Sequence, residues 1–203
     1  MKPLDQAMVK RLQAVARFGW EKGLTAGSGG NLSIRTEEGI WITRSGSSFR
    51  DLQPEDMFLV DQYGQVLYGQ GDAKPSIETG FHLAIYHVRP KVMAVYHCHP
   101  PHALAYALAG LSIPLDSASD RLLLGELAYV PQAEPGSPVL AAAVETALLN
   151  SSCQRGMLLT GHGVIGLGES PEAAYEAAEL MEQAAQVGIL RGLLQEQKKK
   201  IGG

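Results

Sequence analysis

The sequence has few of the features that mark secreted or membrane proteins. Only two cysteines, Cys98 and Cys153, occur in 203 residues, which is too few for a disulfide framework. No run of about 18 apolar residues predicts a membrane span. The segment "MKPLDQAMVKRLQ" also lacks the apolar core of a signal peptide. We therefore expect a cytoplasmic protein without a membrane partner.

The sequence also has little excess of charge of either sign. The formal net charge is -4, and the one basic block, Lys198–Lys200, is typical of a solvated helix end. Nucleic-acid binding needs a basic face, so we expect no nucleic-acid partner. What is present is an ordinary globular composition, with 45% hydrophobic and 19% charged residues. The length predicts one domain over residues 1–203.

The order of periodic segments mixes helices with strands, several of them in hairpin-like pairs, and predicts a three-layer α/β sandwich. The early strands are not separated by helices, which disfavours a doubly wound dinucleotide fold. Helices are expected at residues 4–22, 75–90, 101–110, 138–150 and 172–197. Strands are expected in "NLSIR", "GIWIT", "MFLV" and "QVLY", at 92–99 and 127–130, and on both sides of the turn at 161–163.

Three of the six histidines fall in the short segment "YHCHPPH". Residues two apart on a strand share a face, so His97 and His99 point the same way, with Cα atoms about 7 Å apart. Cys98 then faces the opposite side as a small packed residue. Two imidazoles at this spacing can converge on one divalent ion, for which a catalytic site usually supplies three protein ligands. An exposed strand end rich in histidine is the alternative.

A third ligand candidate is His162, in the segment "TGHGVIG". Glycines on both sides let the backbone approach closely and adopt left-handed torsions. An exposed turn residue is the alternative there. Of the remaining histidines, His102 is expected to be exposed at a helix start and His87 to lie on the surface.

Glu78 is expected on the first turn of the helix that begins with "KPS", near the positive end of the helix dipole. It is either a plain helix-start residue or a general base beside a metal. His82 follows four residues later, so the two side chains share a helix face. This spacing predicts a carboxylate–histidine contact or a supporting role behind the metal site.

The glycine-rich loop "GSGGN" lacks the Gly-x-Gly-x-x-Gly fingerprint and leads into a strand. Its backbone amides can form an anion nest. Ser45 and Gly46 in a turn, and the hydroxyl of Ser76 at a helix start, add donors of the kind that hold phosphate. Together these features predict a small anionic substrate.

Taken in order, these motifs resemble the class II aldolase/adducin family over nearly the whole chain. The matching segments are "GLTAGSGGNLSIR", "GIWITRSG", "KPSIETGFHLAIYHVRP", "AVYHCHPPHALA" and "LLTGHGVIGLG", followed by the alanine-rich terminal helix. The chain looks closest to small sugar-phosphate aldolases of the L-fuculose-phosphate type. The resemblance implies a central mixed, largely antiparallel sheet flanked by helices. It also implies a homotetramer with active sites at subunit boundaries.

The resemblance also implies roles for individual residues. His97, His99 and His162 match the ligands of Zn²⁺, or of Co²⁺, Mn²⁺ or Fe²⁺, and Glu78 matches the catalytic acid/base. The residues that match the phosphate pocket are Gly30, Asn31, Ser45, Gly46 and Ser76. Adducin-type members lack the metal histidines. The presence of all three histidines in this chain therefore favours an enzyme over a non-catalytic interaction module.

The sequence departs from the aldolase pattern at two places. Ile77 stands where a second phosphate-binding serine is expected, so one anion contact is lost. No tyrosine falls near Ala118, where the aldolases have one that works across the subunit boundary. Asp120 falls close to the sequence position at which the epimerases have an acidic catalytic residue, so it is a possible second acid/base. Tyr129 is a more distant candidate.

The resemblance implies a zinc-dependent lyase that cleaves a small keto-sugar phosphate by a retro-aldol reaction through a metal-stabilised enediolate. The same enediolate serves a 4-epimerase, a methylthioribulose-phosphate dehydratase or a phosphotetronate decarboxylase, which stay open as alternatives. A simple metallohydrolase fits less well, because no glutamate shares the strand or the turn with the histidines as a water-activating base.

Overall fold

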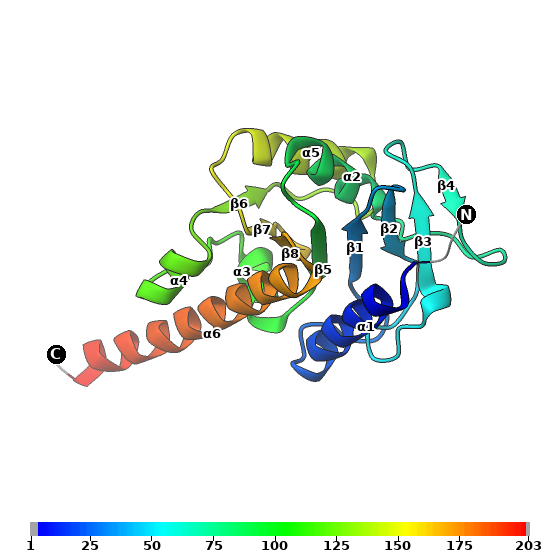
Figure 1. The fold of residues 1–203 in the computed structure, drawn as a ribbon. Helices are drawn as coiled ribbons and strands as arrows, with labels where there is room; N and C mark the ends of the chain where they lie inside the picture. The colour runs from blue at the N-terminus through cyan, green and yellow to red at the C-terminus, as the bar shows by residue number, and fades with distance from the viewer. Residues whose placement is uncertain (1–3, 202–203) are drawn as a thin grey trace.

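A computed structural model describes residues 4–201, which form an eight-stranded sheet between two layers of helices (Figure 1). The strand order is β4-β3-β2-β1-β5-β8-β7-β6. The strands are β1 (Asn31–Arg35), β2 (Ile40–Thr43), β3 (Met57–Val60), β4 (Val66–Tyr68), β5 (Ala94–Cys98), β6 (Leu127–Val130), β7 (Gly156–Leu159) and β8 (Gly163–Gly168). Only β6 and β7 pair in parallel. The predicted mixed, largely antiparallel sheet is therefore confirmed.

The helices cover both faces of the sheet. They are α1 (Gln6–Glu21), α2 (Thr79–Val88), α3 (Pro101–Ala109), α4 (Ala118–Leu123), α5 (Pro138–Leu149) and α6 (Pro171–Ile201), with a 3₁₀ turn at Pro54–Asp56. Helices α2 and α5 lie on one face, and α1, α3 and α6 lie on the other (Figure 1). Each layer has its own buried apolar cluster, so the predicted three-layer sandwich is confirmed.

Strand β5 lies in the middle of the sheet, and every residue in it is buried. Its side chains alternate between the two layers, as strand geometry requires. Tyr96 and Cys98 enter the cluster beneath α1 and α6, whereas Val95 packs with α2 and α5. His97 shares the face of Val95. Cys98 is a buried free thiol on the opposite side, as predicted, and burial raises its pKa well above the ordinary range.

Helix α2 begins later than predicted. Residues 75 and 76 are extended, because the Ser76 N–H donates to the carbonyl of Thr43 and Arg44 forms a β-bridge with Pro75. The helix then starts at Thr79, with Glu78 as its N-cap residue rather than a member of its first turn. Glu78 thus lies at a change of direction between an extended segment and a helix, where its side chain can turn toward the sheet.

Two further differences concern α4 and α6. Helix α4 was not predicted, and it begins with a capping box in which Ser117 and Asp120 bond each other's backbone N–H groups. Helix α6 continues to Ile201, beyond the expected end at residue 197, and finishes with the Lys198–Lys200 block in its last turn. Among the residues described, no helix is both long and apolar enough to cross a membrane.

Candidate metal centre

The three predicted histidine ligands meet at one end of β5. His97 is in the strand, His99 follows directly after it, and His162 lies in the turn between β7 and β8. Strands β5 and β8 are antiparallel neighbours, with Cys98 opposite Val164. This register places the turn that contains His162 beside the end of β5. One nitrogen atom from each ring lies within 4.8 Å of those from the other two.

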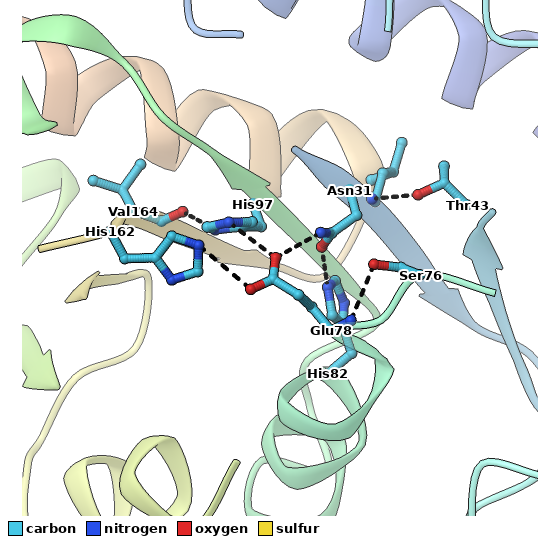
Figure 2. A network of polar contacts seen from close by, with 9 residues as sticks. Asn31, Thr43, Ser76, Glu78, His82, His97, His162 and Val164 are labelled. Atoms are coloured by element: carbon cyan, nitrogen blue, oxygen red, sulfur yellow. Dashed lines mark hydrogen bonds and ion pairs between the residues drawn. The ribbon is translucent and has the colours of Figure 1, made fainter. Parts of the chain in front are cut away.

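The hydrogen bond of His97 fixes which ring nitrogen faces this centre. Its Nδ1 lies 2.9 Å from the carbonyl oxygen of Val164 (Figure 2). A carbonyl only accepts, so Nδ1 carries a hydrogen, and Nε2 is the ring nitrogen left to face the centre. Nε2 atoms of both His97 and His99 are buried without a hydrogen-bond partner among residues 4–201. Buried polar atoms normally have partners, so these two atoms are suited to a metal ion.

Glu78 completes the group from the opposite side. Its carboxylate oxygens lie 3.2 Å from Nε2 of His97 and 3.4 Å from Nε2 of His162 (Figure 2). Burial alone raises the pKa of Glu78, but contacts with His97, Asn31 and His162 outweigh burial and bring the pKa to about 2. A buried carboxylate that faces the ring nitrogens of two histidines is suited to a cation between them.

The charge states of His99 and His162 agree with metal binding. The pKa of each ring is lowered to about 4, mainly by burial and also by the neighbouring His97. Both rings are therefore neutral at pH 7, and the neutral imidazole is the form that binds metals. Three imidazoles beside one carboxylate fit a divalent transition metal.

A cavity of about 770 Å³ opens beside the histidines. Its walls include His99, His162 and Glu78 together with all the residues predicted to bind phosphate, namely Gly30, Asn31, Ser45, Gly46 and Ser76. Ile77 also lines the cavity and is 65% exposed. The structure thus gathers the predicted anion site and the predicted metal site around one space.

The loop before β1 fits tightly against β5 at this cavity. Gly30 has a φ of 92°, and a Cβ atom there would lie 2.7 Å from the carbonyl oxygen of His97. Both conditions favour glycine. The glycine-rich segment therefore places backbone close to His97.

Asn31 connects the cavity to residues behind it. Its side-chain N–H donates to Glu78 over 2.9 Å, and its amide oxygen lies 2.5 Å from Nε2 of His82 (Figure 2). The expected contact between Glu78 and His82 is therefore replaced by an indirect one through Asn31. Sequence analysis missed this link. Asn31 and Ser33 are two residues apart and so share one face of β1, and Asn31 is paired with His97 on the neighbouring strand β5.

The other candidate residues lie away from the cavity. His102 bonds Glu182 of α6 over 2.6 Å, so its predicted exposure is only partial. His87 is exposed, as predicted. Asp120 caps α4, and Tyr129 is 42% exposed on β6. Neither Asp120 nor Tyr129 lines the cavity of its own chain.

Comparison with known proteins identifies the family. A sequence model of the Class II Aldolase and Adducin N-terminal domain matches residues 10–189. An L-fuculose phosphate aldolase of Methanococcus maripaludis is 30% identical over 84% of this chain and 90% of its own. A 5-methylthioribulose-1-phosphate/5-deoxyribulose-1-phosphate aldolase of Rhodospirillum rubrum is 34% identical over 81% of this chain and 72% of its own.

A solved structure agrees with these matches. The L-fuculose-1-phosphate aldolase of Thermus thermophilus superposes with a TM-score of 0.82 at 26% identity and covers 95% of this chain and 97% of its own. The family match, the fold and the histidine cluster thus agree with one another. The chain belongs to the class II aldolase and adducin family, and it is an enzyme of the class II aldolase type.

Proposed function

We propose that the protein is a zinc-dependent lyase that cleaves a small keto-sugar phosphate by a retro-aldol reaction. The observation that carries this proposal is the meeting of three imidazoles, one buried carboxylate and a set of anion donors around one cavity. The relatives described above, which are named as sugar-phosphate aldolases, support it. We further propose that it acts as a single domain in the cytoplasm.

His97, His99 and His162 would hold the metal, with Co²⁺, Mn²⁺ or Fe²⁺ as alternatives to Zn²⁺. A divalent ion there would act as a Lewis acid on the oxygens of the keto-sugar and stabilise the enediolate that remains when the C–C bond breaks. The Val164 carbonyl keeps His97 in the tautomer that binds metal. Glu78 is the one carboxylate among the described residues that line the cavity, so it carries the proton at the substrate.

The anion donors support a phosphorylated substrate. Ser45, Gly46 and Ser76 line the cavity on the side of β2, and Gly30 adds the loop before β1. Arg44 lines the cavity as well, but its guanidinium is paired with Asp56. Backbone N–H groups and hydroxyls are therefore the expected phosphate contacts. The side-chain amide of Asn31 is already bonded to Glu78 and His82.

Metal analysis tests the first part of the proposal. Purified protein should contain about one divalent ion per chain, since three imidazoles usually make one catalytic site. His97→Ala should remove both the ion and the activity. His87→Ala is the matched control, because this exposed histidine lies outside the cavity. Metal-free protein that keeps full activity would contradict the proposal.

A substrate screen tests the second part. Keto-sugar 1-phosphates and their unphosphorylated and acid analogues should be incubated with the metal-loaded protein, and the products identified. We expect an aldehyde and a three-carbon keto phosphate, formed only from phosphorylated substrates. Formation of an epimer, a dehydrated product or CO₂ would instead assign the chain to the 4-epimerase, dehydratase or decarboxylase reactions. Because each reaction has its own product, the screen separates them directly.

A further inference from the structure

A chain of buried polar side chains runs from Glu78 away from the cavity. Beyond Asn31 it continues through His82 to Ser33, whose hydroxyl lies 2.7 Å from Nδ1 of His82. The hydroxyl of Tyr86 is a further 2.8 Å from that of Ser33. All five side chains are buried, with exposures of 7% or less. Figure 2 shows the part nearest the cavity, where Asn31 lies between Glu78 and His82.

The side-chain amide of Asn31 fixes the direction of the first two hydrogen bonds. Its N–H group lies 2.9 Å from a carboxylate oxygen of Glu78, which accepts. The amide oxygen of Asn31 then faces Nε2 of His82, and an amide oxygen also only accepts. Nε2 of His82 must therefore carry a hydrogen. The opposite amide orientation would set an oxygen against the carboxylate and leave both without a proton to share.

The remaining bonds follow from the state of His82. A neutral imidazole with a hydrogen on Nε2 has a bare Nδ1, so the Ser33 hydroxyl donates to it. The Ser33 oxygen can then accept from the Tyr86 hydroxyl. Every bond in the chain donates toward Glu78. A hydrogen-bonded chain with one direction is stronger than its separate bonds, because each bond polarises the next.

Packing holds the His82 ring in place. The ring is fully buried and stacks on Phe81, with ring centroids 4.6 Å apart and an interplanar angle of 17°. Burial is also the main cause that lowers the pKa of His82 to about 3, so the ring is neutral at pH 7. A neutral, immobile ring with both nitrogens bonded can impose one orientation on Asn31.

We propose that His82 is a positioning residue: its Nε2–H holds the Asn31 amide in the orientation that donates to Glu78, and so aims the carboxylate. This inference rests on the proposed function, in which Glu78 carries the proton. Neither His82 nor Asn31 needs to exchange a proton with the substrate. Loss of the His82 donor would let the Asn31 amide turn, and the Glu78 carboxylate would lose its fixed partner.

The tautomer of His82 tests the proposal without any substrate. The full chain, loaded with zinc and labelled with ¹⁵N-histidine, is suited to a two-bond ¹H–¹⁵N spectrum, with His82 assigned by its loss in His82→Gln. We expect a protonated Nε2 and a bare Nδ1. A hydrogen on Nδ1, or on both nitrogens, would overturn the proposal. This result stands even if the proposed sugar-phosphate cleavage fails, so the two failures are distinguishable.

Kinetics test the consequence for Glu78. His82→Phe keeps the stacking on Phe81 but removes the donor, and we expect kcat to fall roughly 10–100-fold, the usual effect of losing a partner behind a metal site. KM and zinc content should stay within about twofold of those of the unchanged protein, since the metal ligands and anion donors remain. His82→Gln, whose side-chain N–H can replace that of Nε2, should recover part of the lost kcat. If His82→Phe does not fold, the kinetics of His82→Gln and the tautomer seen in the ¹H–¹⁵N spectrum still test the proposal.

A pair of tyrosine variants provides a matched control. Tyr86→Phe removes the far end of the chain and should lower kcat by a few-fold. Tyr96→Phe removes a hydroxyl that is equally buried but faces the opposite side of β5 and has no hydrogen-bond partner in the part of the chain that the structure describes. It should leave kcat unchanged. Unaltered kcat in folded His82→Phe, or a parallel loss of zinc and kcat, would contradict the proposal.

Discussion

Four side chains meet at the end of β5, and together they provide the ligand atoms for one ion. The hydrogen bond from His97 to the Val164 carbonyl leaves Nε2 to face the centre. The pKa of about 2 keeps Glu78 ionised beside it. His99 and His162 remain neutral because burial and His97 bring the pKa of each to about 4. At pH 7 the site therefore offers three ring nitrogens and one negative charge to a divalent cation.

Replacement of this carboxylate separates proton transfer from metal binding. Glu78→Gln keeps the size of the side chain but cannot accept a proton, so we expect kcat to fall by roughly 10²–10⁴-fold. The three histidines remain, so the metal content should not change. Steady-state kinetics and metal analysis check this prediction. Glu21→Gln, which alters an exposed carboxylate on α1, is the control. Equal kcat in both variants would show that Glu78 carries no proton.

His82 makes the stability of the metal-free protein depend on pH. Burial and His97 lower its pKa from 6.5 to about 3, with Glu78 acting in the opposite direction. Below pH 6.5 the unfolded chain binds a proton at this residue that the folded chain does not. Stability therefore falls as the pH falls, by up to about 1.4 kcal/mol per pH unit, until the pH nears about 3.

Denaturant unfolding of the metal-free protein at about pH 7 and about pH 4.5 measures this effect. His82→Gln cannot bind the proton, so its loss of stability between the two pH values should be about 2.5 kcal/mol smaller than that of the unchanged chain. Titrating groups that do not interact with His82 are common to both proteins and cancel in the comparison. An identical pH dependence of the two proteins would contradict the assignment of a neutral His82.

At the scale of elements, the position of the turn that carries His162 depends on how closely α6 packs on β8. A Cβ atom at Gly166 would lie 2.0 Å from the carbonyl oxygen of Ala174, and one at Gly168 would lie 2.4 Å from the nitrogen of the same residue. These glycines allow the helix backbone to rest directly on the strand. The strand that follows His162 and carries the Val164 carbonyl is held in place by this contact.

Two glycine substitutions test this packing. Gly166→Ala must push α6 away from β8, so we expect it to lower the free energy of unfolding by roughly 1–3 kcal/mol and to weaken metal binding. Gly192→Ala is the matched control, because this α6 residue is exposed and a Cβ there meets nothing within 4 Å. It should raise stability by up to about 1 kcal/mol through helix propensity. Urea unfolding distinguishes these opposite signs.

Most elements could be predicted because the periodicity of their residues follows from local geometry. Strand alternation separated His97 and His99 from Cys98, and Gly110 ended α3 with a φ of 65°. The start of α2 could not be found this way, because the bonds of residues 74–76 to the segment after β2 are not local in sequence. The four-residue spacing of Glu78 and His82 therefore did not produce the direct contact that was one of its two predicted outcomes. Their link through Asn31 depends on the pairing of β1 with β5.

At the scale of the whole molecule, large apolar side chains remain exposed on three helices. Figure 1 shows α6 reaching away from the sheet, with α4 near it. Leu122 of α4 is 84% exposed, Leu194 of α6 is 66% exposed, and Leu108 of α3 is 68% exposed. Exposed apolar side chains of this size favour association. They support the homotetramer that the family resemblance implies, in which a second copy would cover these helices.

This surface leads to a prediction about assembly. Sedimentation velocity should show a particle with the mass of four chains, and Leu122→Glu and Leu194→Glu should each reduce that mass, because a buried unpaired charge opposes association. Tyr63→Glu is the control, since this residue is 78% exposed but lies in the turn between β3 and β4, at the other edge of the sheet. If active sites form at subunit boundaries, the two leucine variants should also lose activity while they keep their metal. A fully active single chain would contradict both the tetramer and the shared site, and would require the second proton-transfer group to come from within the chain itself.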